Sequence, residues 1–208
     1  MEIKCEQRSD EWYAARLGLL TCSQFPKLMP TARQGPDDWN ETQLSILREV
    51  AAERLTGKRE ESYTSSAMQW GIDNEDMARY TFEAETMETV RKCGFFRSDV
   101  SPNFVGGSPD GIIVRDGEDW GVAEFKCPTS KQHLRYILDP DELWKDYGWQ
   151  VLGQRLVTGL NNGAICSYDP RFPENKQLVI AGTNAPQCDM DALIERLNSA
   201  VDLIKGWI

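Results

Sequence analysis

The sequence predicts an α/β protein that is built around a strand hairpin near the middle of the chain. Two short apolar runs, 112–114 and 120–127, flank a turn-like run with an Asp-Gly step, a pattern typical of a β-hairpin. Helical spacing of apolar residues occurs on both sides, at 44–55, 68–87, 141–158 and 190–204. Because no repeat or linker divides these patterns, we expect a single domain that spans residues 1–208.

The composition is that of an ordinary soluble globular protein, with 40% hydrophobic and 27% charged residues. No apolar run approaches the roughly 20 residues of a membrane-spanning helix. The N-terminus is polar and lacks a signal-peptide core. The six cysteines are scattered without a CxxC pair, which argues against zinc and iron–sulfur sites. We therefore expect a cytoplasmic protein with reduced thiols and no membrane partner.

The formal net charge of −10 argues at first sight against nucleic acid as a partner. Net charge does not report the local field, however, and a groove needs positive charge only where it holds its ligand. The single histidine, His133, leaves little room for chemistry that needs a histidine cluster.

The hairpin brings charged residues to one edge of the predicted sheet. Glu124 and Lys126 are two apart on one strand and share a face, while Asp110 opens the other strand level with Glu124. Two carboxylates suit a hard cation such as Mg²⁺, and the carbonyl of Phe125 adds an oxygen ligand. Lys126 then orients or deprotonates a water, or offsets charge on a phosphate. The alternative is a surface hairpin with an ordinary Glu/Lys pair. The apolar neighbours Val122, Ala123, Phe125 and Cys127 disfavour it.

A second candidate site lies near the N-terminus. Ser9 is a plausible N-cap of a helix that ends at Gly18, and a short helix, 24–29, follows with Thr21 or Ser23 as its cap. This order places Arg16 beside hydroxyls and the free N–H groups of a helix start, which suits an anion. The alternative is a solvated arginine beside routine capping residues.

Further strand patterns lie at 89–96, 103–106, 164–168 and 177–181. The segment 129–138 carries Lys131, His133 and Arg135, which form either a phosphate-contacting face or an ordinary solvated helix face. The apolar stripe of 190–204 is expected to pack in the core or against another subunit.

The hairpin residues Ser108-Pro109-Asp110-Gly111 and Glu124-Phe125-Lys126-Cys127-Pro128 resemble the PD-(D/E)xK nuclease motif. More narrowly, they resemble the lambda-type phage exonucleases, also called the YqaJ-type viral recombinase family. Four more blocks resemble that family in order: EWYAARLGLLTCSQF, WGIDNEDMARYTFE, YGWQVLGQRLVTG and Tyr168-Asp169-Pro170-Arg171. The resemblance thus covers nearly the whole chain.

The resemblance implies a restriction-endonuclease-like fold, in which helices flank a central mixed β-sheet. It also implies a bacteriophage enzyme that acts in the bacterial host cell. Such an enzyme degrades one strand of linear double-stranded DNA from the 5′ end and leaves a 3′ overhang for annealing-type recombination. A ring-shaped homotrimer and a single-strand-annealing recombinase are the partners implied.

The family's site residues are carried over position by position. Asp110 and Glu124, with the Phe125 carbonyl, would hold two Mg²⁺ ions, for which Mn²⁺ substitutes, and Lys126 would assist the nucleophile. Glu75 and Gln150 would complete the catalytic shell; from the residues alone, Glu75 is equally a surface ion pair with Arg79, and Gln150 a solvated polar residue. The pocket for the terminal 5′-phosphate would be formed by Arg16, Thr21, Ser23 and Ser108. Contacts to DNA are expected from Trp12 (which is equally a core residue), Arg33, Lys131 and Arg135.

Two alternatives stay open at this point. One is another nuclease of the superfamily, an endonuclease or a CRISPR-associated iron–sulfur type, although the scattered cysteines count against the latter. The other is a non-catalytic DNA-end-binding protein, against which the intact Asp110, Glu124 and Lys126 speak.

Overall fold

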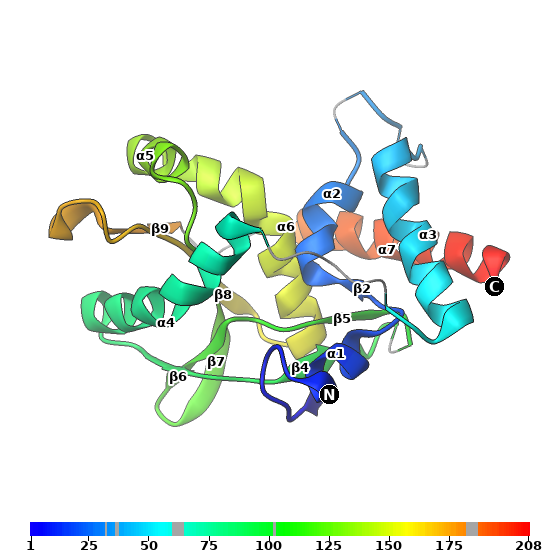
Figure 1. The fold of residues 1–208 in the computed structure, drawn as a ribbon, viewed down its shortest axis with the longest axis horizontal. Coiled ribbons are helices and arrows are strands. Elements are labelled where there is room, and N and C mark those ends of the chain that lie inside the picture. Colours follow the sequence, from blue (N-terminus) through cyan, green and yellow to red (C-terminus); the bar gives the residue numbers. More distant parts are fainter. Residues whose placement is uncertain (32, 36–37, 60–64, 102, 182–186) are drawn as a thin grey trace.

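The computed structural model describes residues 1–31, 33–35, 38–59, 65–101, 103–181 and 187–208. In these ranges the strands form two sheets, with the helices packed against them (Figure 1). The larger sheet has the strand order β3-β6-β7-β8-β9, and the smaller sheet has the order β1-β4-β5-β2.

The larger sheet is mixed, as the family resemblance implies. Strands β7 and β8 run parallel, and the other neighbouring pairs run antiparallel. The turn of the β6–β7 hairpin has Asp116 and Gly117 at positive φ, which matches the predicted Asp-Gly step. The strand bounds are β3 Thr89–Arg91, β6 Gly111–Arg115, β7 Glu118–Lys126, β8 Asn162–Tyr168 and β9 Leu178–Ala181.

The smaller sheet corrects one prediction. The apolar segment 89–96 is not one strand, because the chain leaves β3 in the larger sheet and enters β4 in the smaller one. The apolar residues of segment 89–96 therefore belong to two different sheets, which the pattern of a single strand does not reveal. The strand bounds are β1 Glu2–Ile3, β2 Leu20–Thr21, β4 Phe95–Arg97 and β5 Val105–Gly107.

The predicted cap at Ser9 is confirmed, whereas Thr21 caps the 3₁₀ turn Cys22–Gln24 and the short helix α2 begins after Gln24. Ser9 accepts a hydrogen bond from the Trp12 N–H at the start of α1, and Asn40 with Gln43 forms a capping box at the start of α3. Gly57 ends α3 in the left-handed conformation. None of the helices in the described ranges is long and apolar enough to cross a membrane. Their bounds are α1 Asp10–Arg16, α2 Phe25–Leu28, α3 Glu41–Thr56, α4 Ser66–Thr86, α5 Ser130–Leu138, α6 Asp141–Thr158 and α7 Gln187–Trp207, with 3₁₀ turns at Cys22–Gln24 and Glu174–Lys176.

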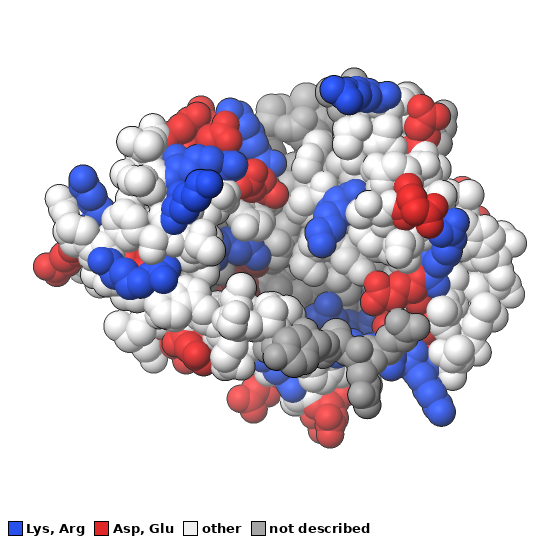
Figure 2. Space-filling model, turned by 45° about the horizontal axis from the view of Figure 1, so that its top comes forward, with Lys and Arg blue, Asp and Glu red and all other residues white. Residues whose placement is uncertain are grey.

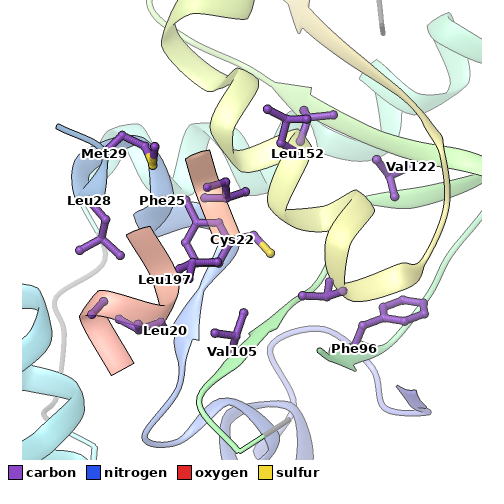
Figure 3. Close-up of a cluster of buried hydrophobic side chains, with 14 of the residues drawn as sticks. Leu20, Cys22, Phe25, Leu28, Met29, Phe96, Val105, Val122, Leu152 and Leu197 are labelled. Atoms are coloured by element: carbon purple, nitrogen blue, oxygen red, sulfur yellow. The ribbon is translucent and has the colours of Figure 1, made fainter. Parts of the chain in front are cut away.

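Helix α6 runs through the middle of the molecule, and the main hydrophobic core forms around it (Figures 1 and 3). It carries Leu152 into a cluster with Phe25 of α2 and Leu197 of α7. Each such side chain stabilises the fold by about 1.5–3 kcal/mol through burial. A Cβ on Gly153 would lie 2.3 Å from Cδ2 of Phe25, so glycine is needed for α6 to approach α2 this closely.

Some apolar positions that the helical patterns place in the core lie at the surface. Leu55, Ile72 and Tyr80 are exposed by 65%, 36% and 53%. On α4 the buried residues are Ala78 and Phe82, four residues apart, so its packed face is narrower than the apolar pattern suggests. The α7 stripe does pack in the core, where Leu193 and Ile204 are fully buried.

Candidate active site

A cavity of about 570 Å³ opens where α1, α4, α6 and the ends of β5 and β7 meet. Figure 2 shows the surface hollowed near its centre, with basic side chains in and beside the hollow, although the net charge is −10. Most of the residues that the sequence singles out line this cavity: Trp12, Arg16, Thr21, Ser23, Glu75, Ser108, Asp110, Glu124, Phe125, Lys126 and Gln150.

Glu124 is the centre of the hydrogen bonding in this cavity. It lies on β7 and is only 2% exposed. Its Oε1 accepts from Lys126 Nζ and from Gln150 Nε2, both at 2.5 Å, and its Oε2 accepts from Gln154 Nε2 at 2.5 Å. A buried carboxylate needs such donors to stay charged. Both of its oxygens are therefore held in fixed directions.

Gln154 is a site residue that sequence reasoning missed. It is completely buried, and it follows Gln150 by one helical turn on α6, so both amides point to the same carboxylate. The signal was the spacing of four between two glutamines in YGWQVLGQRLVTG. The prediction that Gln150 faces the active site agrees with its hydrogen bond to Glu124.

Asp110 lies directly before β6, and the register Gly111↔Ala123 sets it level with Glu124, as the hairpin predicts. Its Oδ2 accepts a hydrogen bond from the Phe125 N–H at 2.7 Å. Burial, together with the charges of Glu124 and Glu75, raises the pKa of Asp110 well above its ordinary value.

Lys126 supplies positive charge to this pair of carboxylates. Burial lowers its pKa, but the charges of Glu124 and Asp110 outweigh burial and hold the pKa of Lys126 above its ordinary value. The ammonium therefore stays charged and keeps its bond to Glu124.

The carboxylate oxygens of Asp110 and Glu124 suit a hard divalent metal. Carboxylate oxygens are the ligands that such ions prefer, and the mutual repulsion of the carboxylates favours a cation between them. Among the described residues, however, no three His, Cys, Asp or Glu side chains are gathered closely enough to hold an ion. Glu75 faces the same cavity from α4, but its Oε2 is bonded to Arg8 at 2.5 Å. The suggested Glu75–Arg79 pair is wrong, since Arg79 pairs with Asp76 and Glu83.

The predicted anion-binding residues line the same cavity. Arg16, Thr21, Ser23 and Ser108 all line it. The hydroxyls of Thr21 and Ser23 are 3.3 Å apart. Burial, and then the charge of Arg59, lower the pKa of Arg16, so this half-buried guanidinium favours an anionic partner.

Trp12 contacts two residues of this anion-binding group, Ser108 and Arg16. Its indole N–H donates to Ser108 Oγ at 3.0 Å, and the guanidinium carbon of Arg16 lies 4.1 Å from the centre of its ring. Trp12 is 9% exposed and packs with Ala15, Leu19 and Phe95. It thus fixes two residues of the anion-binding group, while direct contact of Trp12 with DNA stays a prediction.

Three of the predicted DNA contacts lie away from the cavity. Arg33 and Lys131 are exposed, and Arg135 forms ion pairs with Asp146 and Glu142. Their role stays a prediction.

The proposed face of Lys131, His133 and Arg135 is wrong for His133. That side chain is fully buried and bonds Ser167 Oγ at 2.7 Å and the Lys176 carbonyl at 2.8 Å. Residues two apart on a helix do not share a face, so the inner side of α5 takes His133 into the core.

The block Tyr168-Asp169-Pro170-Arg171 forms a corner after β8. Asp169 is completely buried and accepts hydrogen bonds from Arg171 Nε at 2.7 Å and from Ser130 Oγ at 2.8 Å. Burial raises the pKa of Asp169, but the hydrogen bonds from Arg171 and Ser130 outweigh burial and lower it. This corner ties the end of β8 to the start of α5.

Solved structures of known proteins share this fold. An alkaline exonuclease from Laribacter hongkongensis, LHK-Exo, superposes with a TM-score of 0.82 at 27% identity, over 95% of this chain and 93% of that chain. LHK-Exo in complex with dAMP gives a TM-score of 0.76 at 27% identity, over 95% of each chain. A phage-related exonuclease from Haemophilus somnus 129PT, at 16% identity, shows the fold alone, with a TM-score of 0.71 over 89% of this chain and 93% of that chain. Fold and site together define a nuclease of the restriction-endonuclease-like class.

The model of the YqaJ-like viral recombinase domain matches residues 11–161, and the chain belongs to that family. No curated protein matches the chain. The predicted family, the predicted fold class and the prediction of a phage-type DNA exonuclease are thereby confirmed.

Proposed function

We propose that this exonuclease is a divalent-metal-dependent enzyme that degrades one strand of linear double-stranded DNA from 5′ to 3′. The observation that carries the proposal is that two groups of residues share one cavity. One is the acidic group around Asp110 and Glu124, and the other is the anion-binding group around Arg16. If the anion-binding group holds a terminal phosphate, the acidic group cuts the strand at a fixed distance from that end.

The residues would divide the chemistry as follows. Asp110 and Glu124, with the carbonyl of Phe125, would hold Mg²⁺, with Mn²⁺ as a substitute and two ions in the full site. When bound, such an ion acidifies water and neutralises charge on the phosphate. Lys126 stays protonated beside Glu124 and offsets charge that develops on the phosphate. Gln150 and Gln154 hold Glu124 in one orientation, and Glu75 would complete the shell.

The polarity rests on the anion-binding group. Arg16 would pair with a dianionic terminal phosphate, and the hydroxyls of Thr21, Ser23 and Ser108 would donate to it. If that phosphate is at the 5′ end, the strand enters by this end, is shortened from it, and leaves the complementary strand as a 3′ overhang. The structure of LHK-Exo has been solved in complex with dAMP. Because dAMP is a mononucleotide, that complex is consistent with an enzyme that removes single nucleotides.

We further propose that the enzyme works as a ring-shaped homotrimer beside a single-strand-annealing recombinase, in the cytoplasm of a bacterial host cell. A closed ring keeps its basic residues on the DNA although the subunit is acidic. Light scattering should return three times the subunit mass, and a monomer at micromolar concentration would exclude the ring.

The test of the proposed function uses linear and circular duplexes of one sequence, with a label on either the 5′ or the 3′ end, and with Mg²⁺ or EDTA. We expect only the linear duplex to be degraded, the 5′ label to be released first, and EDTA to stop the reaction. Glu124→Gln should be inactive. Glu118→Gln, an exposed carboxylate on the same strand, is the matched control and should be active. Cutting of the circle would indicate an endonuclease, and no cutting of either substrate would indicate an end-binding protein.

A further inference from the structure

Arg8 forms an ion pair with the Glu75 carboxylate at the edge of the active-site cavity. Its guanidinium nitrogen lies 2.5 Å from Glu75 Oε2, and the two side chains are exposed by 39% and 25%. Both residues line the cavity that holds Asp110 and Glu124. The pair joins positions 67 residues apart in the chain, so it fixes the segment before α1 to helix α4.

The backbone around Arg8 is built for this contact. Residues 6–9 form a turn that is closed by the Ser9 N–H and the Glu6 carbonyl at 3.1 Å, and Arg8 has φ 70 in it. At this position of a turn, glycine is unstrained and arginine is not. Gln7, next to it, donates to the carbonyl of Pro109 at 2.7 Å, directly before Asp110. The turn therefore contacts the site at two places, at Glu75 through Arg8 and next to Asp110 through Gln7.

The ion pair also stands between two cavities. A second cavity of about 560 Å³ adjoins the first one, and the residues that line both are Gln7, Arg8, Glu75, Asp110 and Phe125. Glu75 and Asp110 thus both line the two cavities, so a cation near Asp110 would be accessible from either cavity. In this structure Oε2 of Glu75 is paired with the Arg8 guanidinium.

We infer that Arg8 is a positioning residue that competes with the divalent metal for Glu75. This inference rests on the proposed metal-dependent function. Three carboxylates face the cavity, yet the described residues contain no group of three acidic or other ligating side chains that holds an ion. Glu75 completes such a group once its carboxylate turns from Arg8 to the metal. Arg8 therefore sets how much metal the enzyme needs before its ligands are complete.

The expected size of the effect follows from charge. A unit positive charge about 6 Å from a dication weakens its binding about tenfold even at the dielectric constant of bulk water. Removing the guanidinium should therefore tighten metal binding by about tenfold or more. A residue that merely orients Glu75 as a ligand would have the opposite effect, because losing an outer-shell partner typically weakens metal affinity by 10- to 100-fold.

The test is direct titration of the protein with Mn²⁺ in the absence of DNA, followed by calorimetry or by the EPR signal of the free ion. Arg8→Met removes the charge and keeps the turn strain, whereas Arg8→Gly removes the charge and relieves the strain. We expect the Kd for Mn²⁺ to fall by about tenfold or more in both variants. Arg8→Lys, which keeps the charge, should stay close to wild type. Arg48→Met is the matched control, because it breaks an exposed ion pair of the same length, Arg48–Glu41 at 2.5 Å, on α3.

The outcomes separate this inference from the proposed function. If wild type binds Mn²⁺ and Asp110→Asn weakens the binding, the metal site stands. An unchanged or weaker affinity in Arg8→Met and Arg8→Gly then overturns the competition alone. If wild type binds no Mn²⁺, the metal-dependent function fails, and the competition fails with it. Tighter binding in both variants but not in Arg48→Met supports the inference.

Discussion

Gln154 donates its side-chain N–H to Oε2 of Glu124 at 2.5 Å, from a completely buried position on α6. A hydrogen bond to a charged group contributes about 1.5–3 kcal/mol, so its loss should reduce kcat by about 10- to 150-fold. We expect Gln154→Leu to show this loss with little change in KM for DNA, because residue 154 touches Glu124 and not the substrate cavity. Gln69→Leu removes an exposed glutamine of α4 whose amide donates to Asp73, and it should keep wild-type turnover. Full turnover in Gln154→Leu would show that Gln150 and Lys126 suffice to orient Glu124.

Asp110→Asn should abolish hydrolysis, by about 1000-fold or more, and at the same time stabilise the metal-free protein. Burial and the charges of Glu124 and Glu75 raise the pKa of Asp110, so its ionised form is the less stable one in the folded state. A raised pKa means that this contribution to stability is present at acid pH and is lost as pH rises through the folded pKa. The gain in Tm of Asp110→Asn over wild type, measured in EDTA, should therefore be small at acid pH and should grow as pH rises. A lower Tm for the variant at neutral pH would contradict this account.

The corner at Asp169 should respond to pH in the opposite direction. The hydrogen bonds from Arg171 and Ser130 outweigh burial and lower the pKa of Asp169, so its stabilisation is present above its unfolded pKa and is lost as pH falls through the folded pKa. We expect Asp169→Asn to lower the free energy of unfolding by about 2–3 kcal/mol at pH 7, which urea denaturation would measure. The difference from wild type should shrink at low pH, where Asp169 is protonated in both states. A difference that is the same at both pH values would mean that packing, and not charge, is lost.

Arg16→Ala should erase most of the preference for a 5′-phosphorylated end. A charge-assisted contact together with hydroxyl donors is worth about 2–4 kcal/mol, or about 30- to 1000-fold in rate. We expect wild type to degrade the 5′-phosphorylated duplex faster than the 5′-hydroxyl duplex by this factor. Trp12→Phe keeps a ring under Arg16 and loses the N–H to Ser108, so it should lose only part of the preference. Equal rates of wild type on both ends would exclude the pocket.

The acidic centre of the site was predictable because its spacing is local. Glu124 and Lys126 are two apart on one strand, and a hairpin with a short turn fixes Asp110 opposite them. The helix cap at Ser9 was predictable for the same reason, since it acts on its own next turn.

What could not be predicted depends on how distant elements dock. The reach of Gln154 to Glu124 depends on how α6 docks on the sheet at β7 and β8. The ion pair of Arg8 and Glu75 spans 67 residues, and no local pattern indicates it. His133 looks exposed in a polar segment, and only the docking of α5 on β8 shows that it is buried and bonds the buried Ser167.

The parallel pairing of β7 and β8 has a consequence for the order in which the site forms. Glu124 lies on β7, but its amide partners lie on α6, within the crossover that must close before β8 can pair with β7. During synthesis, a chain extended only to Lys126 already contains Glu75, Asp110 and Glu124, but it lacks Gln150 and Gln154, the two amides that hold Glu124. Such long-range pairing is slow compared with helix and hairpin formation. Glu124 is therefore present early and fully oriented late, so we expect the newly made chain to be inert until its crossover has folded.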